Sequence, residues 1–524
     1  MSALVTDQFR IENSANFVES VNDSNNSYYV WLGLPNPNIY TGFARNLNWK
    51  GSEGVPVGVV PNPIDNPSHL SQYKDSLLFG KRITSSNVKR IVKRVDWIKG
   101  KKYDMYRHDY SDSNLTSVSK STRLYNSEFY VINSDFNVYI CISNGSGGDS
   151  SQANQSQYEP TFTDLEPSPA GNGSDGYLWK YLFSISPSDI IKFDSTEYIT
   201  LPDNWSTNTN SNIISVRDNG NSDENTNQIK TVYIDNAGSG YTDGEVDILG
   251  DGQGGRVFIT TNASGEIIST TVTAGGSGYT YGLVDLGSLQ PQGSIQNPAK
   301  LIPIIPPSKG HGYDIYKELG ADKVLIYARF DNATRDFPSN TAFCQIGLLK
   351  NPSSVGSGQT FYDGEFSNLG AIMFDSVNEF LPKVGEKITQ VVDTIDTAKG
   401  YVASYDADTK VLKYFKDRSL FNSTSQDETD YIGISLGAKA NVEFVNSGQN
   451  IIGETSGFSG SVANFTGLTT SVNSSIINLG VEFTDGLAES EINKKTGDIL
   501  YIDNRPLVFR NDRQKEDIKI ILEF

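Results

Sequence analysis

Apolar and polar residues alternate along much of this chain with a period of two, the pattern of strands that bury one face. The clearest example is DGYLWKYLFSI, in which Tyr177, Trp179, Tyr181 and Phe183 fall on the same face. Further runs of strand length are YYVWLGL at 28–34, FYVI at 129–132, VYICI at 138–142, VLIYARF at 324–330 and FCQIGLLKNP at 343–352. Gly-, Ser- and Asn-rich stretches separate many of these runs, so the pattern predicts a mainly β protein with few short helices.

One segment near the start has a helical pattern instead. Residues 6–21 begin with Thr6 and Asp7, and either residue can cap a helix. The apolar residues expected to share the buried face of this helix are Phe9, Phe17, Val18 and Val21.

The last 26 residues, Ile499–Phe524, contain two apolar runs around a polar stretch, 511–517. This arrangement predicts two terminal strands that pair with each other. In the second strand the apolar positions on one face are Ile518, Ile520, Leu522 and Phe524, while Lys519 and Glu523 fall on the other. A half-buried strand needs a partner, so we expect this tail to be held in place by packing.

An 11-residue motif occurs twice, at an offset of 38 residues. GSGYTDGEVDI occupies 238–248 and GSGYTYGLVDL occupies 276–286, and a strand-like run precedes each copy. The repeat predicts a β-turn-β unit in which glycines take the positive-φ positions and the tyrosine packs back over the turn. Two copies are too few for a solenoid, so a small all-β module is favoured.

Composition changes this picture little but limits the classes of protein. The 524 residues are enough for three to four domains. Apolar residues are only 37% of the chain but aromatics reach 11%, which favours cores of Tyr and Phe. No apolar run is long enough to span a bilayer, and the start has no secretory pattern. Cys141 and Cys344 are expected to be buried free thiols in a chain made in a reducing cytoplasm.

Charge is distributed unevenly. The net charge is −19, yet 81–107 contains ten Lys or Arg and two acids, so the rest of the chain carries −27. The stretch is interpretable as a solvated strand edge, as an interface for an acidic partner protein, or as a nucleic-acid contact with Trp97, Tyr103 and Tyr106 as stacking residues. The overall acidity makes nucleic acid the least favoured. The candidate interface residues are Lys89, Arg90, Lys93, Arg94, Lys99, Lys101 and Lys102.

Motifs for catalysis or cofactor binding are weak. GDGQGG at 250–255 has dinucleotide-loop spacing, but the strand-like RVFITT follows it, so a hairpin turn is predicted. DADTK at 406–410 lacks the Gly of a calcium loop and is expected to be the turn of a hairpin over 400–415. With three histidines and no hydrolase signature, neither an enzyme nor a cofactor is predicted, although a structural calcium elsewhere stays open.

Three separated blocks resemble the homodimeric baseplate wedge subunit of T-even-like contractile-tailed phages. The first is ALVTDQFRIENSANFVESV at 3–21; the second is KRVDWIKGKKYDMY with the segment 175–205; the third is FCQIGLLKNP with the tail phrases LYIDNRPLVF and IKIILEF. The resemblance implies a structural subunit of the virion tail baseplate, made in the host cytoplasm. It also implies a homodimer that bridges other wedge proteins, with interfaces that rearrange when the tail contracts.

The remaining segments look like insertions relative to that family. On this basis we expect a core domain assembled from distant segments and interrupted by sandwich- or barrel-like modules. The predicted parts are 1–215 as the N-terminal part of the core, 216–300 as a β module with the repeat, 301–352 as the return to the core, 353–479 as a second β region, and 480–524 as the strands that close the core. The alternatives are a receptor- or glycan-binding tail protein and, from a third class, a polysaccharide depolymerase.

Overall fold

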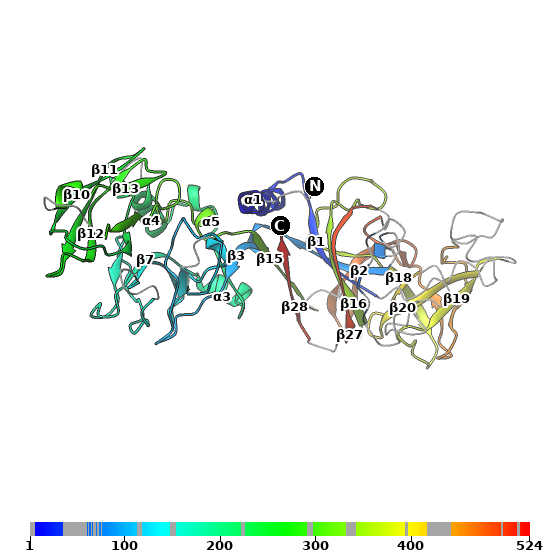
Figure 1. The fold of residues 1–524 in the computed structure, drawn as a ribbon. Helices are drawn as coiled ribbons and strands as arrows, with labels where there is room; N and C mark the ends of the chain where they lie inside the picture. The colour runs from blue at the N-terminus through cyan, green and yellow to red at the C-terminus, as the bar shows by residue number, and fades with distance from the viewer. Residues whose placement is uncertain are drawn as a thin grey trace. The chain divides into compact units, whose positions relative to one another are not determined.

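The computed structural model describes residues 6–34, 60–112, 118–146, 153–221, 226–290, 297–331, 342–393, 397–416, 442–493, 496–510 and 514–524, with gaps at 61, 64, 66–69, 71–72 and 75. The protein is mainly β, as predicted (Figure 1). Its chain divides into two compact units. Unit 1 comprises 1–18, 89–325 and 521–524, and unit 2 comprises 19–88 and 326–520.

The N-terminal helix α1 spans Asp7–Asn22, close to the predicted 6–21. Thr6 caps it, because its Oγ1 accepts a hydrogen bond from the Phe9 backbone N–H at 3.3 Å. The predicted face was wrong for Phe9, whose side chain is 58% exposed. The buried face is instead shifted towards Ile11 and Ser14, and the Ser14 hydroxyl donates to the carbonyl oxygen of Ala321 at 2.6 Å.

The centre of unit 1 is an aromatic core built on a four-stranded sheet. Its strands, in spatial order, are β4 (Tyr130–Ile132), β5 (Asn137–Asn144), β7 (Tyr177–Ser184) and β6 (Ser168–Pro169). The rings of Tyr177 and Trp179 stack at 5.3 Å, and Tyr103 packs edge-on against both. The predicted face of β7 is buried, but Lys180 and Leu182 on its other face are buried as well.

Short helices and a returning segment cover this core. The helices are α3 (Pro187–Phe193), α4 (Ser211–Gly220) and α5 (Ile315–Glu318). Trp205 is 1% exposed, and its indole N–H donates to the carbonyl oxygens of Gly312 and Tyr313, each at 3.0 Å. Ile304 and Ile315 belong to the same hydrophobic cluster as Trp179, so the chain after the repeat packs against the core that precedes it.

The repeat forms its own β module within unit 1, drawn in green in Figure 1. Its sheet has the order β12 (Ile267–Ser277), β11 (Gln253–Thr261), β10 (Gly244–Gly250) and β13 (Gly282–Val284), and β9 (Val232–Asn236) pairs with β14 (Lys300–Pro303).

The two copies of the repeat take the same backbone conformation. Gly238 and Gly276 have φ values of 62° and 61°, and the next glycine of each copy is also at positive φ. Tyr241 and Tyr279 are 4% and 3% exposed, so the predicted turn and its covering tyrosine are confirmed. The Tyr279 hydroxyl accepts from the Gly255 N–H at 3.0 Å and donates to a carbonyl oxygen, whereas that of Tyr241 only accepts from one N–H among the described residues.

The tail differs from its prediction in one respect. β27 (Asp498–Phe509) pairs with β16 (Ala342–Lys350), while β28 (Glu516–Glu523) belongs to a separate sheet of order β28-β15-β3-β8. The other strands of that sheet are β15 (Lys323–Phe330), β3 (Val88–Lys93) and β8 (Tyr198–Thr200). The two terminal strands therefore do not pair with each other, because each finds a partner far away in sequence.

The alternation predicted for β28 is confirmed. Ile518 and Ile520 are buried, while Lys519 and Glu523 are exposed. In unit 1 the ring of Phe524 lies 5.7 Å from that of Phe17 in α1, and the Phe524 N–H donates to the carbonyl oxygen of Asp322 at 3.2 Å. Figure 1 accordingly shows the C-terminus beside α1.

Unit 2 contains a five-stranded antiparallel sheet of order β17 (Glu365–Ser367), β2 (Leu77–Ile83), β1 (Tyr28–Gly33), β16 and β27. Tyr29, Trp31 and Phe366 are buried on it. The amide of Gln345, fully buried on β16, accepts from Ser76 at 2.8 Å and donates to Asn504 of β27 at 3.0 Å. This buried amide network fixes the pairing of β16 with β27.

Unit 2 also contains a barrel. In order, β21 (Val411–Phe415), β20 (Thr397–Asp406), β19 (Lys387–Val391), β22 (Ile451–Gly453), β23 (Ser459–Val462) and β18 (Gly370–Val377) pair, and β18 pairs back onto β21. Six strands thus close on themselves and enclose Phe374, Val402 and Phe458. The hairpin predicted over 400–415, with its turn at 406–410, is confirmed as β20 and β21.

A second hairpin packs on the outside of this barrel. It consists of β24 (Gly467–Val472) and β25 (Ser475–Phe483), and the short β26 (Leu487–Ala488) follows it and pairs with β18. Met373 on the outer face of β18 is buried with Val481 and Phe483 of the hairpin. The barrel wall is therefore covered on both sides at this place.

Candidate assembly surface

The seven candidate interface residues all lie in unit 1, on and just after β3. Lys89, Arg90 and Lys93 are on the strand, Arg94 follows it, and Lys99, Lys101 and Lys102 belong to the loop beyond. β3 pairs antiparallel with β8 through Ile91, Val92 and Lys93. The apolar residues of β3 are buried against this sheet. The basic side chains of the strand therefore either extend into solvent or pair with acidic side chains nearby.

Lys89 is directed inward. Its side chain is 9% exposed and forms ion pairs with Asp189 at 3.3 Å and with Asp203. Burial raises the pKa of the Asp203 carboxyl even though the Lys89 ammonium lowers it. The Lys89 ammonium is therefore engaged by two carboxylates within the unit and is not available to another protein.

The two arginines are also engaged within the unit. The guanidinium carbon of Arg90 lies 3.1 Å from the ring centre of Tyr316, which is part of α5. Arg94 forms ion pairs with Asp96 and Asp194, each at 2.9 Å. Both guanidinium groups therefore join segments of the chain that are about a hundred residues or more apart.

Lys93 and Lys101 share one acid, Glu128, at 3.4 Å and 2.9 Å. Although burial raises the pKa of the Glu128 carboxyl, the hydrogen bonds and charges of the two lysines bring it below its ordinary value. The Lys93 side chain is 63% exposed, so this pairing is a surface interaction worth little to stability.

Lys99, Lys101 and Lys102 lie on or beside a turn that backbone hydrogen bonds hold in place. The Lys101 N–H donates to the carbonyl oxygen of Ile98, Gly100 has a φ of 81°, and the Gly100 N–H donates to Ser156 at 2.7 Å. The turn exposes Ile98 by 56% and leaves Lys99 exposed beside it. An apolar side chain flanked by lysines on a fixed turn is suited to contact an acidic partner.

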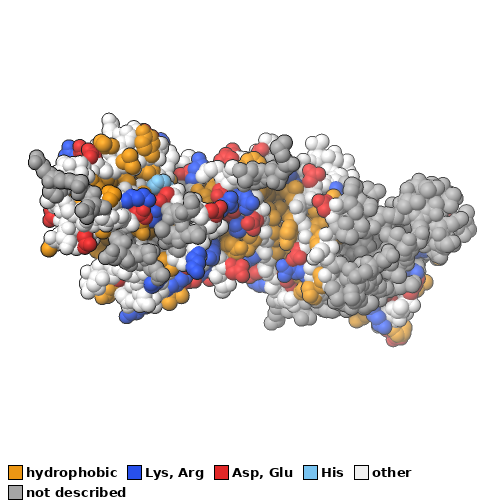
Figure 2. All heavy atoms as spheres, viewed as in Figure 1, with side chains coloured by type: hydrophobic (Ala, Val, Ile, Leu, Met, Phe, Trp, Pro, Cys, Tyr) orange, Lys and Arg blue, Asp and Glu red, His pale blue; other side chains and the backbone are white. Residues whose placement is uncertain are grey.

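The structure thus divides the candidate set. Lys89, Arg90 and Arg94 are held by partners within unit 1. Lys93 and Lys99 are exposed, whereas Lys101 and Lys102 are half-buried. Three of the acids that pair with Lys89 and Arg94 had no signal in the sequence because they lie on α3 or after it: Asp189, Asp194 and Asp203. Figure 2 shows one face of the molecule, on which Lys and Arg side chains lie among Asp and Glu side chains. The assignment of the seven residues to an interface stays a prediction.

A charge network around the buried Lys180 was not predicted. Lys180, fully buried on β7, donates to the Leu165 carbonyl oxygen and to the Asn219 side chain, the latter at 2.8 Å. Glu166 accepts from Asn219 at 2.8 Å and from Lys230 at 2.6 Å. Burial and, to a smaller extent, the charge of Lys230 lower the pKa of Lys180 to about 8. This network ties β7 to α4.

The weak motifs take the structures expected of turns. GDGQGG joins β10 to β11 in an antiparallel hairpin, and in the DADTK turn the Asp406 carboxylate accepts from the Asp408 N–H at 3.0 Å. Within the described ranges no group of three His, Cys, Asp or Glu could hold a metal ion.

The two cysteines have the environment that the sequence predicts. Cys141 and Cys344 are buried and free, as predicted, and burial raises the pKa of each thiol. No helix among the residues described is long and apolar enough to cross a membrane.

No protein-family profile matches this chain. The chain is, however, similar to baseplate wedge protein gp8 of Enterobacteria phage T4, with 25% identity over 218 residues. The match covers 38% of this chain and 60% of that protein, so the chain spans less than two thirds of the length of its relative. For part of its length, the chain therefore has a baseplate wedge-like relationship.

Proposed function

We propose that this chain is a structural, non-enzymatic subunit of a phage tail baseplate wedge. The observation that carries the proposal is the similarity to a protein named as a baseplate wedge protein. In the virion the chain would be part of the tail baseplate, after synthesis in the host cytoplasm. Its two buried free thiols are compatible with synthesis in a reducing compartment.

The phrases that carry the resemblance have structural tasks, which supports a scaffold over an enzyme. DGYLWKYLF forms the buried strand β7 with its Lys180 network. FCQIGLLKNP and YIDNRP form β16 and β27, joined by the Gln345–Asn504 hydrogen bond. Residues of this kind fix strand pairing and order, and a subunit that holds neighbours in register needs that rigidity.

As a wedge subunit, the chain would form a homodimer and bridge other wedge proteins. We place one contact on the turn at 98–101, with Lys93 and Lys102 beside it, against an acidic surface. Polar interfaces of this kind are easier to break and remake than apolar cores, so they would let the wedge rearrange when the tail contracts.

Cryo-electron microscopy of the intact tail of the phage that encodes this chain tests the role directly. Density for the chain in the baseplate supports the proposal, and density elsewhere in the virion or none at all refutes it. Light scattering on the purified chain tests the dimer separately, since a monomer or a trimer contradicts that part alone.

The contact on the turn has a narrower test. Lys99→Glu with Lys101→Glu reverses two charges on the turn, while Lys300→Glu with Lys317→Glu reverses two exposed charges elsewhere in unit 1 as a matched control. Assembly with the other wedge proteins of the same phage should weaken in the first variant only. Equal assembly of both variants would show that the turn is not an interface.

A further inference from the structure

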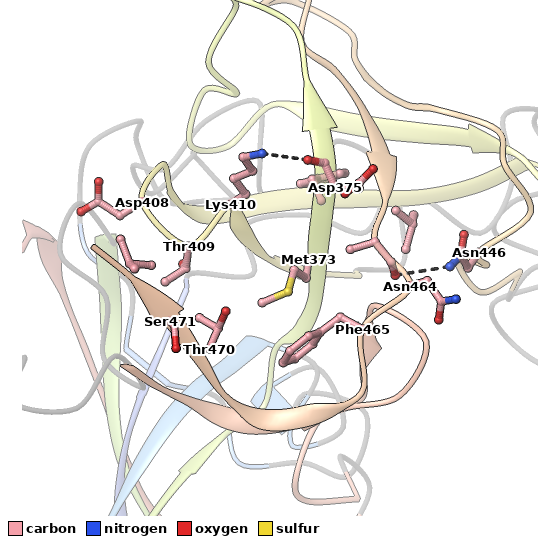
Figure 3. A pocket seen from close by; sticks show the side chains of 14 residues that line it. Met373, Asp375, Asp408, Thr409, Lys410, Asn446, Asn464, Phe465, Thr470 and Ser471 are labelled. Carbon is pink, nitrogen blue, oxygen red and sulfur yellow. Dashed lines mark hydrogen bonds between the residues drawn. The ribbon is translucent and has the colours of Figure 1, made fainter. Parts of the chain in front are cut away.

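A cavity of about 590 Å³ lies in unit 2, between the outer wall of the barrel and the β24–β25 hairpin (Figure 3). Its volume is within the range of small-ligand sites. In Figure 3, Met373 and Phe465 lie at the centre, with Thr470 and Ser471 of β24 on one side and Asn464 on the other. Polar side chains make up most of the remaining lining, together with the apolar residues Phe374, Val462, Ala463 and Val472.

Several of these polar side chains have hydrogen-bonding capacity that the protein does not use. The side chains of Asp375, Asp408, Asn464, Thr470 and Ser471 line the cavity, and none of them forms a hydrogen bond or ion pair within the described part of the chain. These five side chains, four of them exposed and Thr470 half-buried, provide both donors and acceptors around the cavity.

The backbone around the cavity is irregular at two points. β18 pairs Phe374 with Val462 and Ser376 with Ser461, so Asp375 is an extra residue in a β-bulge. A β-bulge changes the direction of the side chain at the extra residue, and Asp375 lies at the edge of the cavity. Lys410 has a φ of 54°, which is uncommon outside glycine, and its ammonium donates to the Asp375 carbonyl oxygen at 2.7 Å.

The chemistry of the lining selects among ligands. Hydroxyl-rich molecules need carboxylate and amide groups with hydroxyls around them, and an apolar surface such as Phe465 suits the C–H face of a sugar ring. Two carboxylates, Asp375 and Asp408, outweigh the ammonium of Lys410, so phosphorylated or acidic ligands are disfavoured. We propose that this cavity is a binding site for a neutral saccharide.

The proposed saccharide site is independent of the proposed wedge role. It lies in unit 2, whereas the basic turn at 98–101 lies in unit 1. It gives the chain a means to contact a carbohydrate surface while it serves as a scaffold. The receptor- or glycan-binding alternative raised by the sequence thereby becomes a second activity of one module.

Saturation-transfer-difference NMR on the full chain tests the site, with glucose, galactose, mannose and N-acetylglucosamine as probes and sialic acid as the anionic comparison. The test variants are Asp408→Asn and Thr470→Val, which change one polar group each at nearly constant shape. Their matched controls are Glu482→Gln, an exposed carboxylate on β25, and Thr469→Val, the neighbour of Thr470 on β24 that does not line the cavity.

We expect at least one neutral sugar to bind, with a Kd that rises about tenfold in each test variant and less than about twofold in each control. Because the two test positions lie on different segments, a folding defect in one variant leaves the other as the test. The proposal is overturned if none of the four neutral sugars binds, if the controls lose as much affinity as the test variants, or if sialic acid binds more tightly than every neutral sugar.

Discussion

Replacing Lys180 by methionine should change how the stability of unit 1 depends on pH. The lysine is buried on β7, and its pKa is about 8 in the folded protein against 10.5 for a free side chain. Between these values the unfolded chain holds a proton that the folded chain has released, so stability rises as pH rises. The difference of about 2.5 pH units corresponds to about 3 kcal/mol.

Methionine has similar length but cannot titrate. At neutral pH the variant avoids the cost of a buried charge but leaves the Leu165 carbonyl oxygen and the Asn219 side chain without a donor, at ~1–3 kcal/mol each. These effects oppose each other, so the sign of the change at neutral pH is not diagnostic. The informative quantity is the stability of the variant relative to the natural protein, which should fall by about 3 kcal/mol as pH rises from about 8 to 10.5.

Hydrogen exchange of the β7 amides, measured by mass spectrometry at each pH, provides the assay. The ratio of exchange rates between variant and natural protein cancels the intrinsic pH dependence, and it should increase about a hundredfold across this range. Buried tyrosines with raised pKa values, such as Tyr103, destabilise both proteins equally above pH 10. Lys317→Met, at a lysine that is 55% exposed, is the control. A ratio that does not change with pH would refute the reasoning.

Three further predictions concern other parts of the fold. Deleting Ile521–Phe524 removes the ring that packs on α1, so limited proteolysis should cleave the N-terminal helix faster; unchanged resistance would contradict this contact. Glu386→Gln should destabilise the barrel by ~1.5–3 kcal/mol, because the carboxylate accepts five hydrogen bonds from 383 and 455–456. These bonds hold the pKa of Glu386 low although burial raises it, so the natural barrel should lose stability as pH falls through that pKa while the variant does not, which acid unfolding curves can measure. Tyr279→Phe should cost about 1 kcal/mol more than Tyr241→Phe in urea unfolding, since the Tyr279 hydroxyl makes one hydrogen bond more; equal costs would argue against the pairing described.

Local patterns predicted the elements well because their causes are local. The period of two identified β7 and β28, and the glycine spacing identified the repeat, since a positive φ is set by the residue itself. Partners were harder to predict. The β27 and β28 strands look like a hairpin in sequence, yet each pairs with a strand about 150 residues or more away.

The candidate sites show the same contrast between local features, which the sequence predicted, and distant partners, which it did not. The basic stretch was visible as composition, but Lys89 and Arg94 pair with acids on α3 or just beyond it, which no spacing rule connects to β3. Lys180 was missed because its alternation partner Trp179 made one face of β7 look buried and the other free. The cavity beside Met373 depends on a bulge and on the packing of a hairpin, and neither follows from the local sequence.

The contact between Phe17 and Phe524 also has a consequence for the order of events during synthesis. A ribosome that adds about 5–20 residues per second needs roughly 25–100 s to make the intervening chain. During that time α1 is outside the ribosome without its last packing partner, and the apolar side of the helix is available to chaperones. Unit 1 therefore has to finish folding after most of the chain has been translated. An incomplete chain therefore lacks a finished unit 1.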